Sequence, residues 1–225
     1  MMLLSMPFFR RWFGRAMKPA TEVFGEWAKI GKDEGMERGH AQSVSEMLEF
    51  AEGKLKQNGK NFSAMDIGCG NGWVVRKISQ FESCSLSVGV DGAKEMIEKA
   101  KAIDTDGEGI YHFGILPDWQ PAEKFDFIHS MECFYYLNDP ISFVKKVHDD
   151  WMNAGGWIVM GVDHYEENTD SLSWPEHVGV HMTTLSESQW IDAYKSAGFG
   201  DITAWKGGKK DGFVGTLIIA AKKIE

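Results

Sequence analysis

Three glycines between a short apolar run and a helical pattern narrow the fold of this chain more than any other segment does. The run at 62–67 ends in DIGCGNGW, and apolar residues resume from Trp73 at helical intervals. Glycine reaches left-handed backbone conformations without a Cβ penalty, so such a segment turns sharply and lets a ligand approach the main chain. The stretch therefore predicts a strand, a glycine turn and a helix in direct succession.

The rest of the chain continues the alternation of strands and helices. Strands are predicted at 62–67, 86–90, 110–115, 125–129 and 157–162, and helices at 40–57, from 73, at 92–102, from about 138 and at 186–197. The last two strand-like runs, 202–205 and 213–221, are joined by GGKKDG, which suits a hairpin. We expect an α/β fold: a doubly wound three-layer sandwich whose seven-stranded, mostly parallel sheet ends in an antiparallel carboxyl-terminal hairpin.

Length, charge and cysteine content limit the class of protein. A chain of 225 residues with 43% hydrophobic content suits one domain with a sizeable core. The net charge of -9 argues against a general affinity for nucleic acid, so no nucleic-acid partner is expected. Three widely spaced cysteines form no metal or disulfide pattern, so we expect no metal, a reducing compartment and a cytoplasmic location.

The amino-terminal segment is locally basic. Within residues 1–20, Arg10, Arg11, Arg15 and Lys18 accompany large apolar residues without an acid. An amphipathic cap over a pocket, a disordered or transit-like leader, and a helix lying on a membrane surface all stay open, whereas a transmembrane segment is not expected. We interpret residues 1–39 as a helical cap on one domain that spans 40–225, with a loop at about 163–186 covering the acceptor.

The residues around the glycine turn distinguish two classes of ligand. A dinucleotide fingerprint needs a third glycine where this chain has Trp73, which weakens a nicotinamide-dependent reductase. Asp91, at the end of the next strand, suits two ribose hydroxyls, and Asp66 precedes the turn. Two acids around the turn favour a ligand with an amino group and a ribose over one with a pyrophosphate.

Five segments in order resemble a known family. AMDIGCGNGW, VGVDGAKEMIEKA, EKFDFIHSMECFYYLNDP, WMNAGGWIVMGVD and the closing TLSESQWIDAYKSAGFGDI with TLIIAAKK are similar to successive motifs of class I S-adenosylmethionine-dependent methyltransferases, in particular the small-molecule type related to the ubiquinone and menaquinone methylating enzymes. The resemblance covers about residues 40–222. It implies a Rossmann-like methyltransferase fold, S-adenosylmethionine as cofactor with S-adenosylhomocysteine as product, and a small-molecule acceptor.

The resemblance also implies cofactor contacts at particular positions. The methionine end would be lined by Asp66, Gly68, Gly70 and Asn71, the ribose would lie on Asp91, adenine would lie against Gly92, Met96, Gly114, Ile115 and Leu116, and Ser130 and Met131 would close over the methionine part. Gly114, Ile115 and Leu116 stand where the family often has an acid for the adenine amino group.

In-line methyl transfer chiefly requires alignment and exclusion of water, and a general base is needed for alcohols or amines. The candidates are ranked by their position in the predicted fold. They are His164, Tyr135 and Tyr136 after predicted strands, His181 in the covering loop, and His40 at the start of the helix before the first strand. Each histidine has a packing role as its alternative, and His129 is expected to be a hydrogen-bonded core residue. Glu132 resembles a residue common in the family motif and is expected to be structural, with catalysis as its alternative. A binding module that senses S-adenosylmethionine without turnover also stays open, because motifs report binding.

Overall fold

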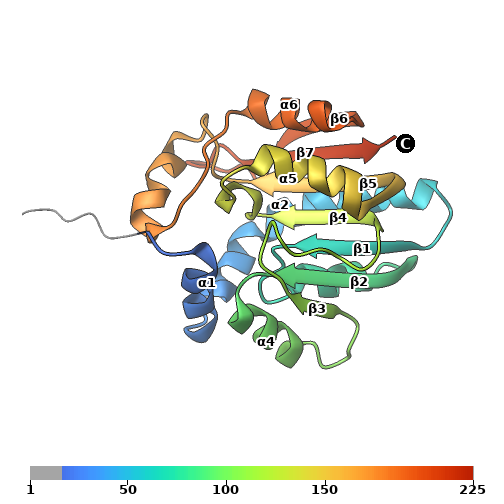
Figure 1. Cartoon of the computed structure of the whole chain (residues 1–225), viewed down its shortest axis with the longest axis horizontal. Coiled ribbons are helices and arrows are strands. Elements are labelled where there is room, and N and C mark those ends of the chain that lie inside the picture. Colours follow the sequence, from blue (N-terminus) through green and yellow to red (C-terminus); the bar gives the residue numbers. More distant parts are fainter. Residues whose placement is uncertain (1–16, 225) are drawn as a thin grey trace, which may run out of the picture.

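The computed structural model describes residues 17–224, and its strands form one seven-stranded sheet (Figure 1). The strands are β1 Phe62–Ile67, β2 Cys84–Asp91, β3 Ile110–Phe113, β4 Phe125–Met131, β5 Met152–Val162, β6 Phe199–Gly207 and β7 Thr216–Lys223. Their order is β3-β2-β1-β4-β5-β7-β6, with β7 antiparallel to both neighbours. The predicted α/β fold with an antiparallel carboxyl-terminal hairpin is confirmed.

The strand order reverses between β1 and β4. The chain adds β2 and then β3 on one side of β1, and it returns to place β4 and β5 on the other side. Ligands of doubly wound sheets bind beyond the carboxyl ends of the strands at such a reversal. The fold therefore marks the end of β1, which carries the glycine turn, as the place for a ligand.

Helices cover both faces of the sheet. They are α1 Ala20–Lys29, α2 Lys32–Gln57, α3 Trp73–Ser79, α4 Lys94–Ile103, α5 Pro140–Lys146 and α6 Glu187–Ala197. Successive residues of a strand point to opposite faces: Ala64 packs with the apolar side of α2 and α3, whereas Met65 and Ile67 belong to the cluster that includes residues of α5 and α6. These buried clusters make the three layers expected from the sequence.

Local signals place several helix ends where the sequence predicts them. Ser186 caps α6 through a capping box with Gln189, and Gly198 ends the helix in a left-handed conformation. Pro140 occupies the first turn of α5, where its missing N–H costs nothing.

The helix before β1 differs from the expectation. It begins at Lys32 rather than near His40, so a boundary at residue 39 falls inside one continuous helix of 26 residues. Gly31, at a φ of 72°, separates α1 from α2, and Asp33 in the first turn favours this start because a carboxylate is stabilised at a helix amino terminus. Strand β5 begins at Met152, earlier than predicted. The prediction missed the start of the strand because two glycines interrupt its apolar pattern.

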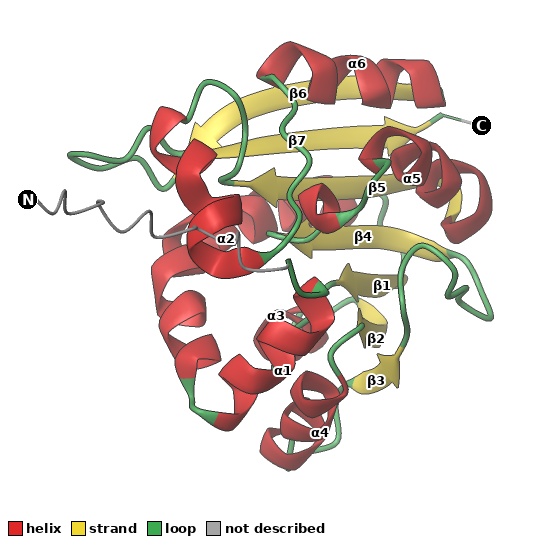
Figure 2. Ribbon diagram, turned by 60° about the vertical axis from the view of Figure 1, so that its left-hand side comes forward, coloured by secondary structure: helices red, strands yellow, loops and turns green. Residues whose placement is uncertain are grey.

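The segment 163–186 runs past the ligand end of the sheet (Figure 2). It contains two short helical turns, Thr169–Ser173 and Pro175–Gly179, and Val180 forms a bridge to Lys18 just before α1. The three interpretations of the basic segment concern residues that, apart from 17–20, lie outside the described part. Within residues 17–224, no helix combines the length and the apolar character that a membrane crossing requires.

Candidate functional site

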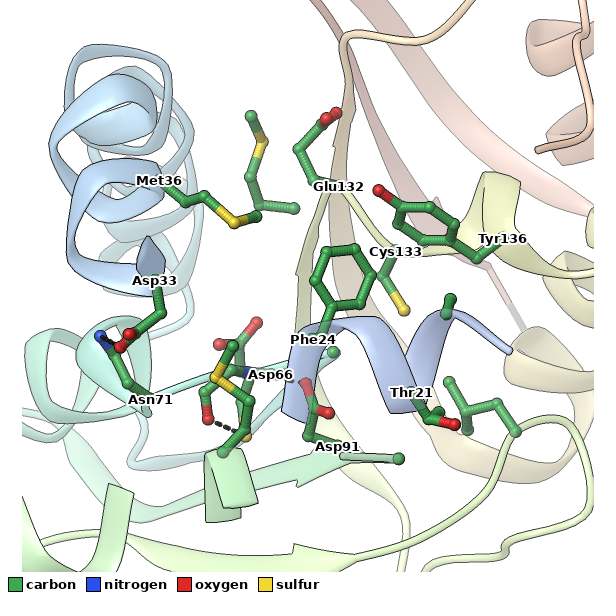
Figure 3. A pocket seen from close by; sticks show the side chains of 18 of the residues that line it. Thr21, Phe24, Asp33, Met36, Asp66, Asn71, Asp91, Glu132, Cys133 and Tyr136 are labelled. Carbon is green, nitrogen blue, oxygen red and sulfur yellow. Dashed lines mark hydrogen bonds between the residues drawn. The ribbon is translucent and has the colours of Figure 1, made fainter. Parts of the chain in front are cut away.

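A cavity of about 410 Å³ opens at the carboxyl ends of β1, β2 and β4. Helices α1 and α2 form two of its walls, and Figure 3 shows Thr21 and Phe24 of α1 beside the glycine turn and β4. Most of the predicted site residues line it: His40, Asp66, Gly68, Gly70, Asn71, Asp91, Gly92, Met96, Ile115, Leu116, Met131, Tyr136 and His181.

The glycine turn needs its three glycines for two reasons. Gly68, Gly70 and Gly72 have φ values of 76°, 52° and 76°, in the left-handed region that favours glycine. A Cβ on Gly72 would lie 2.4 Å from Tyr111 Cε1, whereas a Cβ on Gly70 would meet open space at the cavity. Gly70 therefore exposes its backbone to the cavity, whereas Gly68, on which a Cβ would lie 2.6 Å from Cys133, and Gly72 allow close packing.

Asp91 closes β2 beside this turn. Its Oδ2 accepts from the backbone N–H of Gly70 at 2.9 Å and its Oδ1 from that of Ala93 at 2.7 Å. Removal from bulk water raises the pKa of the Asp91 carboxyl to about 6, although both backbone N–H groups act in the opposite direction. A carboxylate held so firmly at a cavity wall still has lone pairs for ligand hydroxyl groups.

Asp66 and His129 form a buried pair across β1 and β4. The two residues are direct neighbours in the sheet register, and Nδ1 of His129 lies 2.7 Å from Oδ1 of Asp66. The prediction of a hydrogen-bonded core histidine is confirmed. His129 Nε2 is buried without a hydrogen-bond partner in the described part of the chain, and the residue lines the cavity. This atom is therefore a polar group that a ligand or a water could satisfy.

Asn71 ties the turn to helix α2. Its amide Nδ2 donates to Asp33 at 3.0 Å and to Glu37 at 3.3 Å, while its Oδ1 accepts from the backbone N–H of Trp73. Lys99 of α4 pairs with Asp33 at 2.8 Å. The network holds the start of α2 over the cavity, so Asn71 shapes the site as well as lining it.

Two of the expected cofactor residues lie behind the wall. Ser130 is fully buried and donates to the carbonyl of Ile67 at 2.8 Å. Gly114 faces Trp119, and its carbonyl lies behind Gly92. Neither is among the lining residues, so any effect of these two on a ligand is through the residues in front of them.

Some of the five catalytic candidates line the cavity, and the others lie outside it. His40, Tyr136 and His181 line the cavity, whereas Tyr135 lies behind it and donates to Glu132 at 2.7 Å. His164 is buried elsewhere, with contacts from its ring nitrogens to the carbonyl of Ser171 and the hydroxyl of Thr184, and burial lowers its pKa. The structure gives His164 the packing role that was its alternative.

Glu132, His40 and Asp163 form a cluster that no sequence motif indicates. Each offers one ligand atom within 4.8 Å of the others, and His40 Nε2 lies 3.6 Å from Asp163 Oδ2. Glu132 has a left-handed backbone with a φ of 57°, which is uncommon for a non-glycine residue. Its carboxylate accepts from the Tyr135 hydroxyl and from the backbone N–H of Asp163. Such strain is typical of functional sites.

The cluster changes the proton affinities of its members. Burial and the neighbouring Asp163 carboxylate raise the pKa of Glu132 to about 8. Burial alone would lower the pKa of His40, but the Asp163 and Glu132 carboxylates raise it above its ordinary value. Both residues line the cavity, so a proton can be held at its wall near neutral pH.

Comparison with known proteins gives the family of this chain. A family model described as a methyltransferase domain matches residues 33–204. The chain belongs to this methyltransferase family. The match supports the predicted enzyme class and the cofactor S-adenosylmethionine, and it favours a methyltransferase over the reductase alternative.

Two curated proteins are similar in sequence to part of this chain. A trans-aconitate 2-methyltransferase from Agrobacterium fabrum is 26% identical over 135 residues, covering 59% of this chain and 48% of the relative. A tRNA U34 carboxymethyltransferase from Alteromonas mediterranea is 25% identical over 185 residues, covering 63% and 55%. The chain spans about half the length of these relatives.

Solved structures share the fold of the methyltransferase. A chain from the complex of the Haloferax volcanii Trm112 methyltransferase activator with a methyltransferase has a TM-score of 0.77 and 23% identity, covering 90% of this chain and 98% of that one. The N-methyltransferase NodS from Bradyrhizobium japonicum, solved with S-adenosylhomocysteine, has a TM-score of 0.63 and 16% identity, covering 80% and 85%. These similarities concern the fold alone.

Proposed function

We propose that this protein transfers a methyl group from S-adenosylmethionine to a small molecule inside the cavity. The observation that carries the proposal is Asp91, a carboxylate fixed beside a glycine turn at the reversal point of the sheet. Its charge is costly at that position, as its raised pKa shows, and ligand hydroxyl groups would compensate for the cost.

The lining residues divide the cavity into two halves. For the cofactor half, we place the ribose on Asp91, adenine between Met96 and the 115–116 backbone, and the methionine part along the glycine turn near Asp66. The acceptor half is the opposite wall, with Phe24, Met36, His40, Glu132 and Tyr136. In this arrangement the enclosing walls would align the two reactants and exclude water, which supplies most of the acceleration of a methyl transfer.

The charge of the cavity limits the acceptor. Five carboxyl groups line it, from Asp33, Glu37, Asp66, Asp91 and Glu132. Among the lining residues within 17–224 the one lysine is Lys18, which pairs with Glu22 at 2.6 Å and Glu26 at 3.2 Å, and there is no arginine. Two relatives are named for anionic acceptors, an aconitate and a tRNA. An anionic group would meet repulsion here, which supports a small neutral or cationic acceptor and no nucleic-acid partner.

Two narrower statements belong to the proposal. The motif resemblance to the quinone-methylating subgroup is a hypothesis about the acceptor, and a quinol is one neutral molecule to test. Cys69, Cys84 and Cys133 are free thiols, which supports a reducing, cytoplasmic environment.

Calorimetric titration of the full chain with S-adenosylmethionine, S-adenosylhomocysteine and NADH tests the proposal. We expect both adenosyl ligands to bind and NADH not to bind. Formation of S-adenosylhomocysteine is then followed with pooled phenols, quinols, thiols and amines. Binding without any methylated product would favour the sensor, and no binding of either adenosyl ligand would refute the proposal.

A further inference from the structure

The acceptor wall carries one carboxylate that no lysine or arginine neutralises. Asp33 has Lys99, and Asp91 has two backbone donors. Glu132 forms no ion pair with a lysine or arginine in the part of the chain that the structure describes, and the charged groups nearest to it are His40 and the acidic Asp163. Asp163 itself has a buried Oδ1 without a hydrogen-bond partner among those residues. This corner of the cavity is therefore short of positive charge.

Two aromatic rings line the same cavity as this carboxylate. Phe24 of α1 and Tyr136 pack edge to face with ring centroids 5.1 Å apart, and both residues line the cavity with Glu132 (Figure 3). Aromatic faces attract ammonium groups, and the attraction is greater where water is excluded. A cavity wall with one carboxylate and two aromatic rings suits a small organic cation.

We propose that the acceptor is a small amine that enters as an ammonium ion, and that Glu132 binds its nitrogen and takes its proton. The inference rests on the proposed methyltransferase function. Glu132 is the catalytic residue of the cluster because it would touch the reacting nitrogen. His40, Asp163 and Tyr135 are positioning residues that hold its carboxylate and set its charge.

The step balances in atoms and charge. The ammonium R–NH₃⁺ gives one proton to the Glu132 carboxylate, which frees the nitrogen lone pair. That lone pair forms the bond to the methyl carbon while the methyl–sulfur bond breaks and leaves its electron pair on sulfur. The products are S-adenosylhomocysteine and R–NH₂⁺–CH₃, and Glu132 returns its proton to solvent.

The position of Glu132 supports this role over a structural one. An amide could accept from the Asp163 N–H and donate to the Tyr135 hydroxyl, yet this position has a carboxylate on a left-handed backbone at the cavity wall. A general base within reach of an amine typically contributes 10²–10⁴-fold to the rate. We therefore expect Glu132→Gln to lose at least about 100-fold in kcat/KM for amines.

The test compares three acceptors that share one aromatic skeleton: 2-phenylethylamine, 2-phenylethanol and phenylacetate. Full-length protein is assayed with S-adenosylmethionine by mass spectrometry of products, and binding of each compound to the complex with S-adenosylhomocysteine is measured by calorimetry. A wider set of aliphatic and aromatic amines is run in parallel. We expect methylation or binding of amines alone, and Glu132→Gln should lower amine turnover by at least about 100-fold while cofactor affinity stays within about twofold of wild type.

Asp126→Asn serves as the matched control, because Asp126 is a carboxylate that also accepts from a backbone N–H but lies outside the cavity. It should leave amine turnover unchanged. Three results would overturn the inference and leave the methyltransferase function untouched. They are binding and turnover of the alcohol or the acid alone, absence of both binding and turnover for every amine, and normal amine turnover by a folded Glu132→Gln variant. Loss of activity with EDTA and its recovery with Mn²⁺ or Zn²⁺ would assign the cluster to a metal and would overturn it as well.

Discussion

Replacing Asp91 by asparagine should weaken cofactor binding and leave the stability of the fold nearly unchanged. The wild-type carboxylate accepts from Gly70 and Ala93, and its pKa is raised from 3.8 to about 6 by burial. A raised pKa means that folding favours the protonated form, so the contribution of Asp91 to stability is greatest below about pH 4, falls between about 4 and 6, and is constant above that. A shift of about two pKa units corresponds to a loss of about 3 kcal/mol in folding stability at pH 7.5. This is an upper value because the cavity admits water.

Asparagine removes that cost but introduces another. Its amide group must face one of the two backbone N–H groups, which costs about 1–3 kcal/mol for the donor left unpaired. The two changes nearly cancel, so the midpoint of thermal unfolding should remain within a few degrees of wild type.

Cofactor affinity should change much more. The variant loses charge-assisted hydrogen bonds to the ribose, worth about 1.5–3 kcal/mol, which corresponds to about 10- to 150-fold in the dissociation constant. Calorimetry with S-adenosylhomocysteine and thermal unfolding of the same samples measure both quantities. A loss of affinity below threefold, or a loss that merely follows a large fall in stability, would refute our account of Asp91.

Three further predictions concern the same region. Because Asp91 must be ionised to accept ribose hydroxyls, the affinity for S-adenosylmethionine should be constant above about pH 7 and fall about tenfold per unit below 6; calorimetry between pH 5 and 8 that shows no such fall would contradict this. Gly72→Ala should destabilise the fold by more than about 1 kcal/mol in urea titrations, because its φ is 76° and its Cβ would lie 2.4 Å from Tyr111; an unchanged midpoint would count against the packing role. His164→Gln should lower the thermal midpoint while kcat stays within about twofold, and a large selective loss of kcat would restore His164 as a catalytic candidate.

Most of the sheet could be predicted because each strand is a short apolar run. The run at 62–67 coincides with β1, and the glycine-rich connection before the last run correctly indicated an antiparallel partner. The start of α2 could not be predicted as well, since residues 32–39 are mostly polar and contribute little helical periodicity.

The residues proposed to bind the cofactor are easier to find from the sequence than those proposed to bind the acceptor. The former follow one another in two short motifs, whereas the acceptor cluster joins His40, Glu132 and Asp163 from three distant segments. The rule that ligand sites follow strand ends predicts which residues lie near the site, but it does not predict in which direction their side chains point. Asp163 and His164 are neighbours after β5, yet only Asp163 reaches the cluster, whereas His164 contacts the carbonyl of Ser171.

The continuous helix α2 connects the acceptor wall with the far hairpin of the sheet. His40 and Ser43 lie about one turn apart on it, and Ser43 Oγ contacts Thr216 Oγ1 of β7 at 2.7 Å in a buried position. Glu46, one turn further, accepts from the backbone N–H of Gly208. The hairpin thus fixes the rotation of the helix about its axis, and with it the distance between His40 and Glu132. We therefore expect substitutions in the hairpin, which contributes no lining residue to the cavity, to change the preference of the proposed site among acceptors.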